Sequence, residues 1–225
     1  MQGNNVAVVE PAAVTIGADS FLSRTSGHIN GRLKKVVSGP GSFVYHVGTT
    51  SGYTPVTINV DSGSGDFSVR ANSGGMAGLD ATRSLQHTWS LNSNGVTQAD
   101  ITVQYLQADV PVSAAESFFV FHRNSGGTIA TPGIFGFDVN ANLASLNNVT
   151  QFSDWTLGEP SAVGCLAGQA TWDGGGVTNN WSDATNWICD TVPTTVDLVL
   201  FDNRSAKNVT IDQDIVAGGL QINPG

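Results

Sequence analysis

The stretch Val56-Thr57-Ile58-Asn59-Val60 decides the fold class, because apolar and polar residues alternate along it with period two. Such alternation indicates a β-strand with one buried face and one face in water. The pattern recurs as FSVR at 67–70 and as ITVQY at 101–105. Clusters of Gly, Ser, Asn and Asp separate such stretches and predict hairpin turns, at residues 61–66, 92–95 and 124–127.

The inward phase of the alternating strands predicts the hydrophobic core. Each member of this set is apolar or aromatic and occupies the same phase as its neighbours along the strand. The predicted core residues are Phe43, Tyr45, Val56, Ile58, Val60, Phe67, Val69, Trp89, Leu91, Ile101, Val103, Tyr105, Phe119, Phe121 and Trp155.

Composition supports an all-β globular protein and excludes several classes of function. The 225 residues include 27 Gly and 8 Pro, which is too turn-rich for a helical bundle, and 40% hydrophobic residues, too many for a disordered chain. Nine Lys and Arg against 18 Asp and Glu give a net charge of −9, so we expect no nucleic-acid partner. No stretch reaches the roughly 18 apolar residues of a membrane helix, and we expect no membrane insertion.

The chain divides by composition into three segments. Residues 27–159 carry most of the alternating strands and form the predicted β-sandwich domain. A change near residue 160 introduces the two cysteines and three of the five tryptophans, and residues 160–225 end in short apolar stretches typical of β-solenoid coils. The apolar stretches of residues 1–26 are expected to finish a preceding solenoid or linker strand. The ends of the sequence suggest a segment of a longer chain.

In the last segment, three short apolar stretches predict successive edges of one solenoid coil, at residues 197–202, 208–212 and 219–222. One coil cannot bury its own apolar face, and a solenoid needs about three or more stacked repeats. We therefore expect the last segment, residues 160–225, to begin a stack of solenoid coils.

Cys165 and Cys189 are the only cysteines of the chain and are predicted to form a disulfide. A bridge closing a loop of this length would constrain the unfolded state by roughly 3 kcal/mol. The alternative is a pair of buried free thiols. A metal site is disfavoured, because a structural zinc ion takes four Cys or His ligands with close paired spacing.

Five stretches of residues 27–158 resemble β-sandwich modules of very large bacterial secreted and surface proteins, which are adhesin-like. The matching stretches are GRLKKVV (31–37), FVYHVG (43–48), GYTPVTI (52–58), HTWSL (87–91) and FSDWTLG (152–158). His46 stands where these modules usually carry proline.

The last segment resembles the opening of β-solenoid repeats in autotransporter-like and adhesin-like proteins. The matching stretches are ATWDGGG (170–176), NNWS (179–182), ATNW (184–187), VP (192–193) and DLVLFD (197–202). The two resemblances imply an all-β chain in which an antiparallel β-sandwich is flanked by β-solenoid, parallel β-helix-like end segments. They imply an extracellular, cell-surface, structural or adhesive role in a bacterial repeat protein and supply no catalytic residues.

Trp172, Trp181 and Trp187 are the candidate site residues, with two interpretations. Flat indole rings with nearby Asn179, Asn180 and Asp183 could stack and hydrogen-bond a sugar. Alternatively, the three rings cap the open end of the solenoid, with their N–H groups bonded to loop carbonyls. The second interpretation agrees better with the resemblance.

Other constellations for catalysis or metal binding are weak. His28, His46, His87 and His122 lie in separate β segments without metal-ligand spacing. The acidic stretch 61–66 offers oxygen ligands to calcium but lacks the twelve-residue loop with a terminal bidentate Glu. Neither a nucleophile elbow nor a paired glutamate is present.

We therefore expect a non-catalytic protein without cofactor, metal or catalytic residues. Its expected role is that of a structural or adhesive module in a large extracellular bacterial surface protein. Two alternatives remain, a carbohydrate-binding module using the tryptophan cluster and a self-assembling extracellular fibre subunit. Expected partners are neighbouring modules of the same chain, identical subunits or surface glycans.

Overall fold

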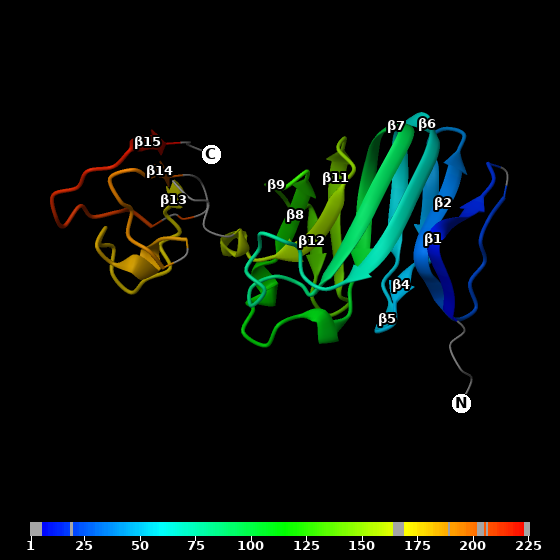
Figure 1. The fold of residues 1–225 in the computed structure, drawn as a ribbon, viewed down its shortest axis with the longest axis horizontal. Coiled ribbons are helices and arrows are strands. Elements are labelled where there is room, and N and C mark those ends of the chain that lie inside the picture. Colours follow the sequence, from blue (N-terminus) through cyan, green and yellow to red (C-terminus); the bar gives the residue numbers. More distant parts are fainter. Residues whose placement is uncertain are drawn as a thin grey trace. The chain divides into compact units, whose positions relative to one another are not determined.

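The computed structural model describes residues 6–18, 20–163, 169–188, 190–201, 205 and 207–222, with the backbone alone at 6–12, 161 and 169. The chain divides into two compact units, Met1–Glu159 and Pro160–Gly225 (Figure 1). Strands dominate the first unit, whereas the second unit holds three short strands between loops, and the described residues contain no α-helix. The expectation of an all-β protein is confirmed.

Within its described residues, the first unit holds twelve strands and two short 3₁₀ helices. The strands are β1 (Val6–Ile16), β2 (His28–Val37), β3 (Gly41–Tyr45), β4 (Gly48–Thr49), β5 (Gly52–Tyr53), β6 (Val56–Ser73), β7 (His87–Gln104), β8 (Val120–Ser125), β9 (Thr128–Gly133), β10 (Gly136–Asp138), β11 (Leu143–Val149) and β12 (Asp154–Gly158). The helices are η1 (Gln107–Asp109) and η2 (Glu116–Phe118). All strands except β4 and β5 belong to one ten-stranded sheet with the main order β1-β2-β6-β7-β12-β8-β9.

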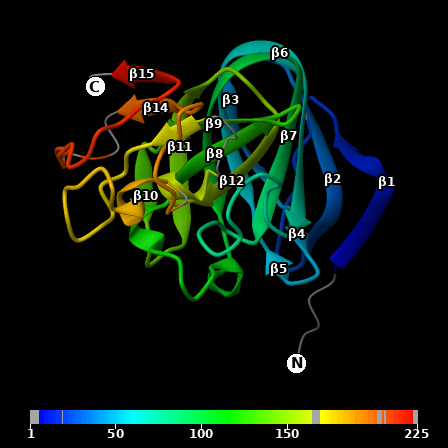
Figure 2. The same ribbon diagram turned by 60° about the vertical axis from the view of Figure 1, so that its left-hand side comes forward.

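The antiparallel pair β6 and β7 organises this sheet, because each strand is 18 residues long and pairs with different neighbours along its length. The first part of β6 pairs with β3 and its second part pairs with β2. Similarly, one end of β7 pairs with β11 and the other with β12. Figure 2 shows the β6–β7 ribbon curving over between these two regions.

The predicted hairpin turns at 61–66 and 92–95 are wrong, since both segments lie within β6 and β7. The register between the strands shifts here, as at β-bulges, so each strand bends without ending. Gly65 has φ +137° and Gly95 has φ +110°, and a Cβ on either would lie 2.0 Å from a carbonyl oxygen of the facing strand. Glycine therefore permits the close approach of two continuous strands. Asp66 of this stretch pairs with Lys34, with 3.0 Å between Oδ2 and Nζ.

The core of the first unit matches the predicted inward phase. All predicted core residues are buried except Phe43, which is partly buried and packs against the same cluster. The β6–β7 register places Val56 opposite Val103 and Ile58 opposite Ile101. Trp89 is fully buried, and its Nε1 donates to the Thr54 carbonyl at 3.1 Å.

The strand β1 belongs to the sheet of the first unit, where it pairs in parallel with β2. The register shifts between Val9 and Ala13, a segment that contains Pro11. Because proline has no N–H to donate, an edge strand with an irregularity is where a sheet accepts it. Residues 6–16 thus form an edge strand of this sheet, which the sequence assigned to a preceding solenoid or linker.

The second unit contains the strands β13 (Gln169–Thr171), β14 (Leu198–Phe201) and β15 (Gly219–Ile222) and the 3₁₀ helices η3 (Pro160–Ala162) and η4 (Ala184–Asn186). The three strands pair in parallel in that order, with Ala170 beside Val199 and Val199 beside Leu220. A second parallel contact joins Asn180 to Thr210.

The prediction that 197–202, 208–212 and 219–222 form successive edges of one coil is wrong. β14 and β15 are direct neighbours in one sheet, and residues 208–212 contribute only the single bridge of Thr210. The intervening chain is long enough to leave the sheet and return beside β14. Short apolar stretches have the same pattern in both arrangements, so the sequence did not distinguish them.

We predict that Gly65→Ala destabilises the first unit by more than about 1 kcal/mol, because the new Cβ meets a backbone carbonyl and the positive φ becomes strained. Denaturant unfolding followed by circular dichroism measures the change. Gly41→Ala is the control, since a Cβ there has no atom within 4 Å. Equal effects of the two substitutions would contradict the proposed close approach at Gly65.

Candidate functional site

The three tryptophans of the second unit form a buried cluster. Trp172 and Trp181 are each 2% exposed and Trp187 is fully buried. Trp187 lies edge-on to both others, with ring centroids 5.1 Å from Trp172 and 4.6 Å from Trp181. Phe201 of β14 contacts all three rings. Such edge-to-face pairs are favoured arrangements of aromatic rings in a core.

Two indole N–H groups of the cluster are bonded to backbone carbonyls. Trp172 Nε1 donates to the carbonyl of Lys207 at 2.9 Å, and Trp187 Nε1 donates to that of Trp181 at 2.8 Å. Burying an indole N–H without a partner would cost stability, so these bonds permit the burial. They are also the carbonyl bonds expected for a tryptophan cap.

A polar network supports the cluster from the adjoining loops. Asn186 is fully buried, and its Nδ2 donates to the carbonyls of Thr178 and Asn180. Its Oδ1 accepts from the Gly176 N–H at 3.0 Å and from Lys207 Nζ at 3.1 Å. One amide therefore joins several turns of the chain around the rings.

Asp183 fixes the start of η4. Its carboxylate accepts bonds from the hydroxyls of Thr178 and Thr185, both at 2.6 Å, and from the Thr185 N–H. These bonds, that of Thr178 first, lower the pKa of Asp183 to about 2. The Asp183 carboxylate therefore stabilises its own loop, and the tryptophans stabilise the core of the unit.

The burial of the cluster bears directly on the sugar-platform interpretation. A pyranose ring stacks on an exposed indole face, and rings that are 0–2% exposed present no such face. Trp172, Trp181 and Trp187 serve here as the core of the second unit. Cys165 and Cys189 lie outside the described residues, so their disulfide stays a prediction.

The rings of His28 and His46 both lie near Tyr53, with centroids 6.4 and 5.9 Å from that of Tyr53, while His87 and His122 have other neighbours. His28 Nε2 lies 2.8 Å from the Thr49 carbonyl, and His122 Nε2 lies 2.9 Å from that of Glu159. His87 is buried beside Asp109, with 3.2 Å between Nδ1 and Oδ2. Within the described ranges, no three His, Cys, Asp or Glu residues come together as metal ligands would.

His46, at the position that proline usually occupies in the resembling modules, belongs to a small aromatic cluster. Its Nδ1 lies 2.6 Å from the Tyr53 hydroxyl, and the Arg24 guanidinium carbon lies 3.7 Å from the Tyr53 ring centroid. Burial and then the Arg24 charge lower the pKa of His46. Burial raises the pKa of Tyr53, against the opposing effect of Arg24. Both groups thus favour their neutral forms.

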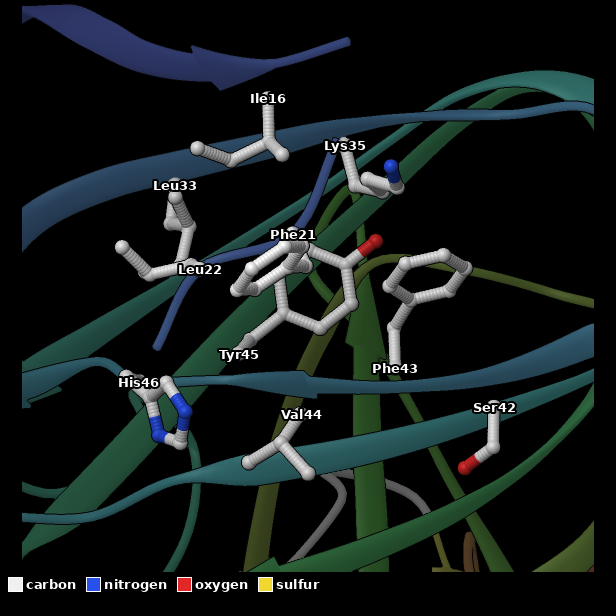
Figure 3. Close-up of a pocket in the computed structure, with 10 residues that line it drawn as sticks. All are labelled: Ile16, Phe21, Leu22, Leu33, Lys35, Ser42, Phe43, Val44, Tyr45 and His46. Carbon is white, nitrogen blue, oxygen red and sulfur yellow. The ribbon is translucent and has the colours of Figure 1, made fainter. Parts of the chain in front are cut away.

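An apolar pocket of ≈ 250 Å³ lies between the end of β1, β2 and β3 (Figure 3). The polar group most suited to hold a ligand there is Lys35, which is 3% exposed. Its ammonium donates to the carbonyls of Gly17, Ala18 and Ser20 and lies 4.6 Å from the Phe43 ring centroid. Three carbonyls use all three ammonium protons, so Lys35 holds the loop after β1 and has none left for an anion.

A second, polar groove lies on the first unit and was missed by the sequence analysis. Its side chains come from β6, β7, β8 and β12 and from the loop after β6. The lining residues are Asn72, Gly75, Met76, Ala77, Thr88, Ser90, Asn124 and Asp154. The strand residues of the groove occupy outward-facing positions of alternating strands. Alternation predicts that they face outward, but it does not predict which strands lie side by side, so it cannot show that these residues meet.

We predict that Trp187→Ala destabilises the second unit by roughly 3–5 kcal/mol, because truncating a buried tryptophan removes packing and leaves a cavity. Hydrogen exchange of peptides from residues 169–222 measures the loss. Val177→Ala is the matched control, since Val177 is fully exposed in the same unit, and should change stability by less than about 0.5 kcal/mol. Wild-type protection in Trp187→Ala would show that the ring is not part of the core.

We predict that the first unit loses stability as the pH falls below about 6.5, in part through His46. The folded pKa of His46 is below its unfolded value, so the unfolded chain binds more protons and acid favours unfolding. Denaturant unfolding at about pH 7.5 and about pH 5 measures this dependence. His46→Gln should show a smaller difference between the two pH values, and an unchanged difference would exclude His46 as a contributor.

Comparison with known proteins identifies no relative from which function could be transferred. No protein-family model, no curated protein and no solved structure matches the chain. No helix in the described part of the chain is both long and apolar enough to cross a membrane. The function must therefore be argued from the two units themselves.

Proposed function

We propose that the chain is a non-catalytic structural module of a large extracellular bacterial surface protein. In this proposal the first unit is an antiparallel β-sandwich and the second unit begins a β-solenoid capped by its tryptophans. The resemblance of residues 27–158 and 170–202 to adhesin-like modules supports the extracellular placement.

One observation carries the proposal, the parallel register of β13, β14 and β15 beside the buried tryptophan cluster. Ala170, Val199 and Leu220 occupy equivalent positions in the three strands. The bridge between Asn180 and Thr210 adds a second line of parallel contact away from the sheet. Two parallel lines are what stacked coils produce, and stacked coils build elongated proteins.

The proposed partner is another β segment, from a neighbouring module of the same chain or from an identical subunit. Leu220 and Ile222 of β15 are 63% and 67% exposed. Among the described residues, β15 pairs with β14 alone. An apolar strand with one unpaired edge is suited to pairing with a further strand.

The use of polar groups within the units supports a structural role over a catalytic one. Lys35 and Lys207 both donate to backbone carbonyls, and Asn186 joins four loop groups. His46 bonds to Tyr53 in a cluster without a carboxylate among the contacts described. These groups stabilise loops, and a module that transmits mechanical force requires stable loops.

Single-molecule force spectroscopy of the intact chain, pulled from its two ends, tests the proposal. We expect two separate unfolding events, each lengthening the chain by about 3.5 Å per released residue. Trp187→Ala should lower the force of the second unit's event alone, while Val177→Ala leaves both forces unchanged. Extension without a resolvable force peak from either unit would contradict a structural, load-bearing role.

A further inference from the structure

The polar groove of the first unit differs from the other polar clusters because it leaves hydrogen-bonding groups open. It has a volume of ≈ 340 Å³ and crosses β6, β7, β12 and β8, which are consecutive in the sheet. Asp154 at its centre is exposed, whereas the next residue of β12, Trp155, is buried. The groove therefore lies on the face opposite the core.

A chain of hydrogen bonds orients the groove side chains. Asn72 Nδ2 donates to Ser90 Oγ at 3.1 Å, and Ser90 Oγ donates to Asp154 Oδ1 at 2.5 Å. Among the described residues, Asn72 Oδ1 and Asp154 Oδ2 accept no hydrogen bond. Two acceptors are thus held in place with their lone pairs unused.

The sheet holds these groups rigidly. Asp154 is opposite Ser90 on one side and Asn124 on the other. The adjacent pair, Trp155 opposite Trp89, is anchored in the core. Sites on packed strands keep their geometry better than sites on loops, and a preorganised site spends less free energy on ordering when it binds.

We propose that this groove binds a neutral saccharide. Neighbouring sugar hydroxyls would donate to Asp154 Oδ2 and Asn72 Oδ1 and accept from the Thr88 hydroxyl or from the second Nδ2 proton of Asn124. Asn124 Nδ2 also donates to the Ala77 carbonyl at 3.4 Å, and its Oδ1 accepts from the Gly127 N–H. Gly75, Met76 and Ala77 supply an uncharged wall for the C–H groups of the ring. The proposal concerns a site separate from the tryptophan cluster and does not rest on the proposed structural function.

The charge of the groove favours a neutral sugar over charged ligands. Asp154 is its single charged side chain, and an exposed pair between one carboxylate and one cation contributes only about 0–1 kcal/mol. A basic peptide would therefore gain little. An acidic sugar would be repelled by Asp154 and by a chain of net charge −9. A neutral polyol gains several directional bonds without either penalty.

Affinity electrophoresis of the full chain tests the proposal, in gels containing glucan, mannan, galactan or xylan, with pectate and alginate as acidic polymers. We expect retardation by at least one neutral polymer and by neither acidic one. Asp154→Ala and Asn124→Ala should each weaken this binding about tenfold, the loss expected for one or two hydrogen bonds to a ligand. Asn92→Ala is the matched control, because Asn92 is an exposed β7 residue outside the groove lining.

The outcomes separate the proposal from its competitors. Thermal melts by circular dichroism establish that each variant is folded before its binding is compared. Absence of retardation in all four neutral gels would overturn the proposal, as would wild-type binding by Asp154→Ala and Asn124→Ala. Binding of a Lys-rich peptide that disappears with added salt, without sugar binding, would identify a cation site instead.

Discussion

The close pairing of β6 with β7 is the constraint on which the first unit depends. Both strands bend at Gly65 and Gly95, which we call the glycine corner. Each strand has one set of neighbours before the corner and another set after it. The register of this single ribbon therefore fixes which side chains of the whole sheet face the core. A slip by one residue would expose Ile58 and Trp89 together, since side chains alternate between faces. Gly65 and Gly95 hold the register because their backbones approach too closely for any side chain.

The alternating pattern predicted the fold class and the core, but it did not predict where strands end. The inward phase of a half-buried strand depends only on local sequence, so Val56, Ile58 and Trp89 could be assigned without knowing their neighbours. Glycine and polar residues occur both in turns and in bulges, and only the facing strand decides between them. The same limit applies to β14 and β15, whose pairing in one sheet depends on where the chain returns.

The candidate sites show a similar division between what local sequence determines and what requires the fold. Tryptophans beside asparagines can form a binding platform or a core. Burial of the indole ring in a core is favoured when its N–H group can donate to a carbonyl within the protein. The Trp187 N–H donates to the carbonyl of Trp181. The groove residues Asn72 and Ser90 come from the consecutive strands β6 and β7, whereas Asp154 of β12 follows Ser90 by 64 residues in the chain. Their meeting follows from the sheet order, which no single stretch of sequence contains.

Strand β12 shows how one β-strand can contribute both to a packed core and to an open polar face. In β12, Trp155 lies in the core while Asp154 faces the groove, so consecutive residues serve opposite faces. The inward residue is stabilised by packing in the core, and this packing also fixes the backbone that positions the outward residue. A polar group can then stay open to a ligand without loosening the fold, because its rigidity comes from its neighbour. The buried tryptophans of the second unit lack this freedom, since their hydrogen bonds and ring faces are both used inside.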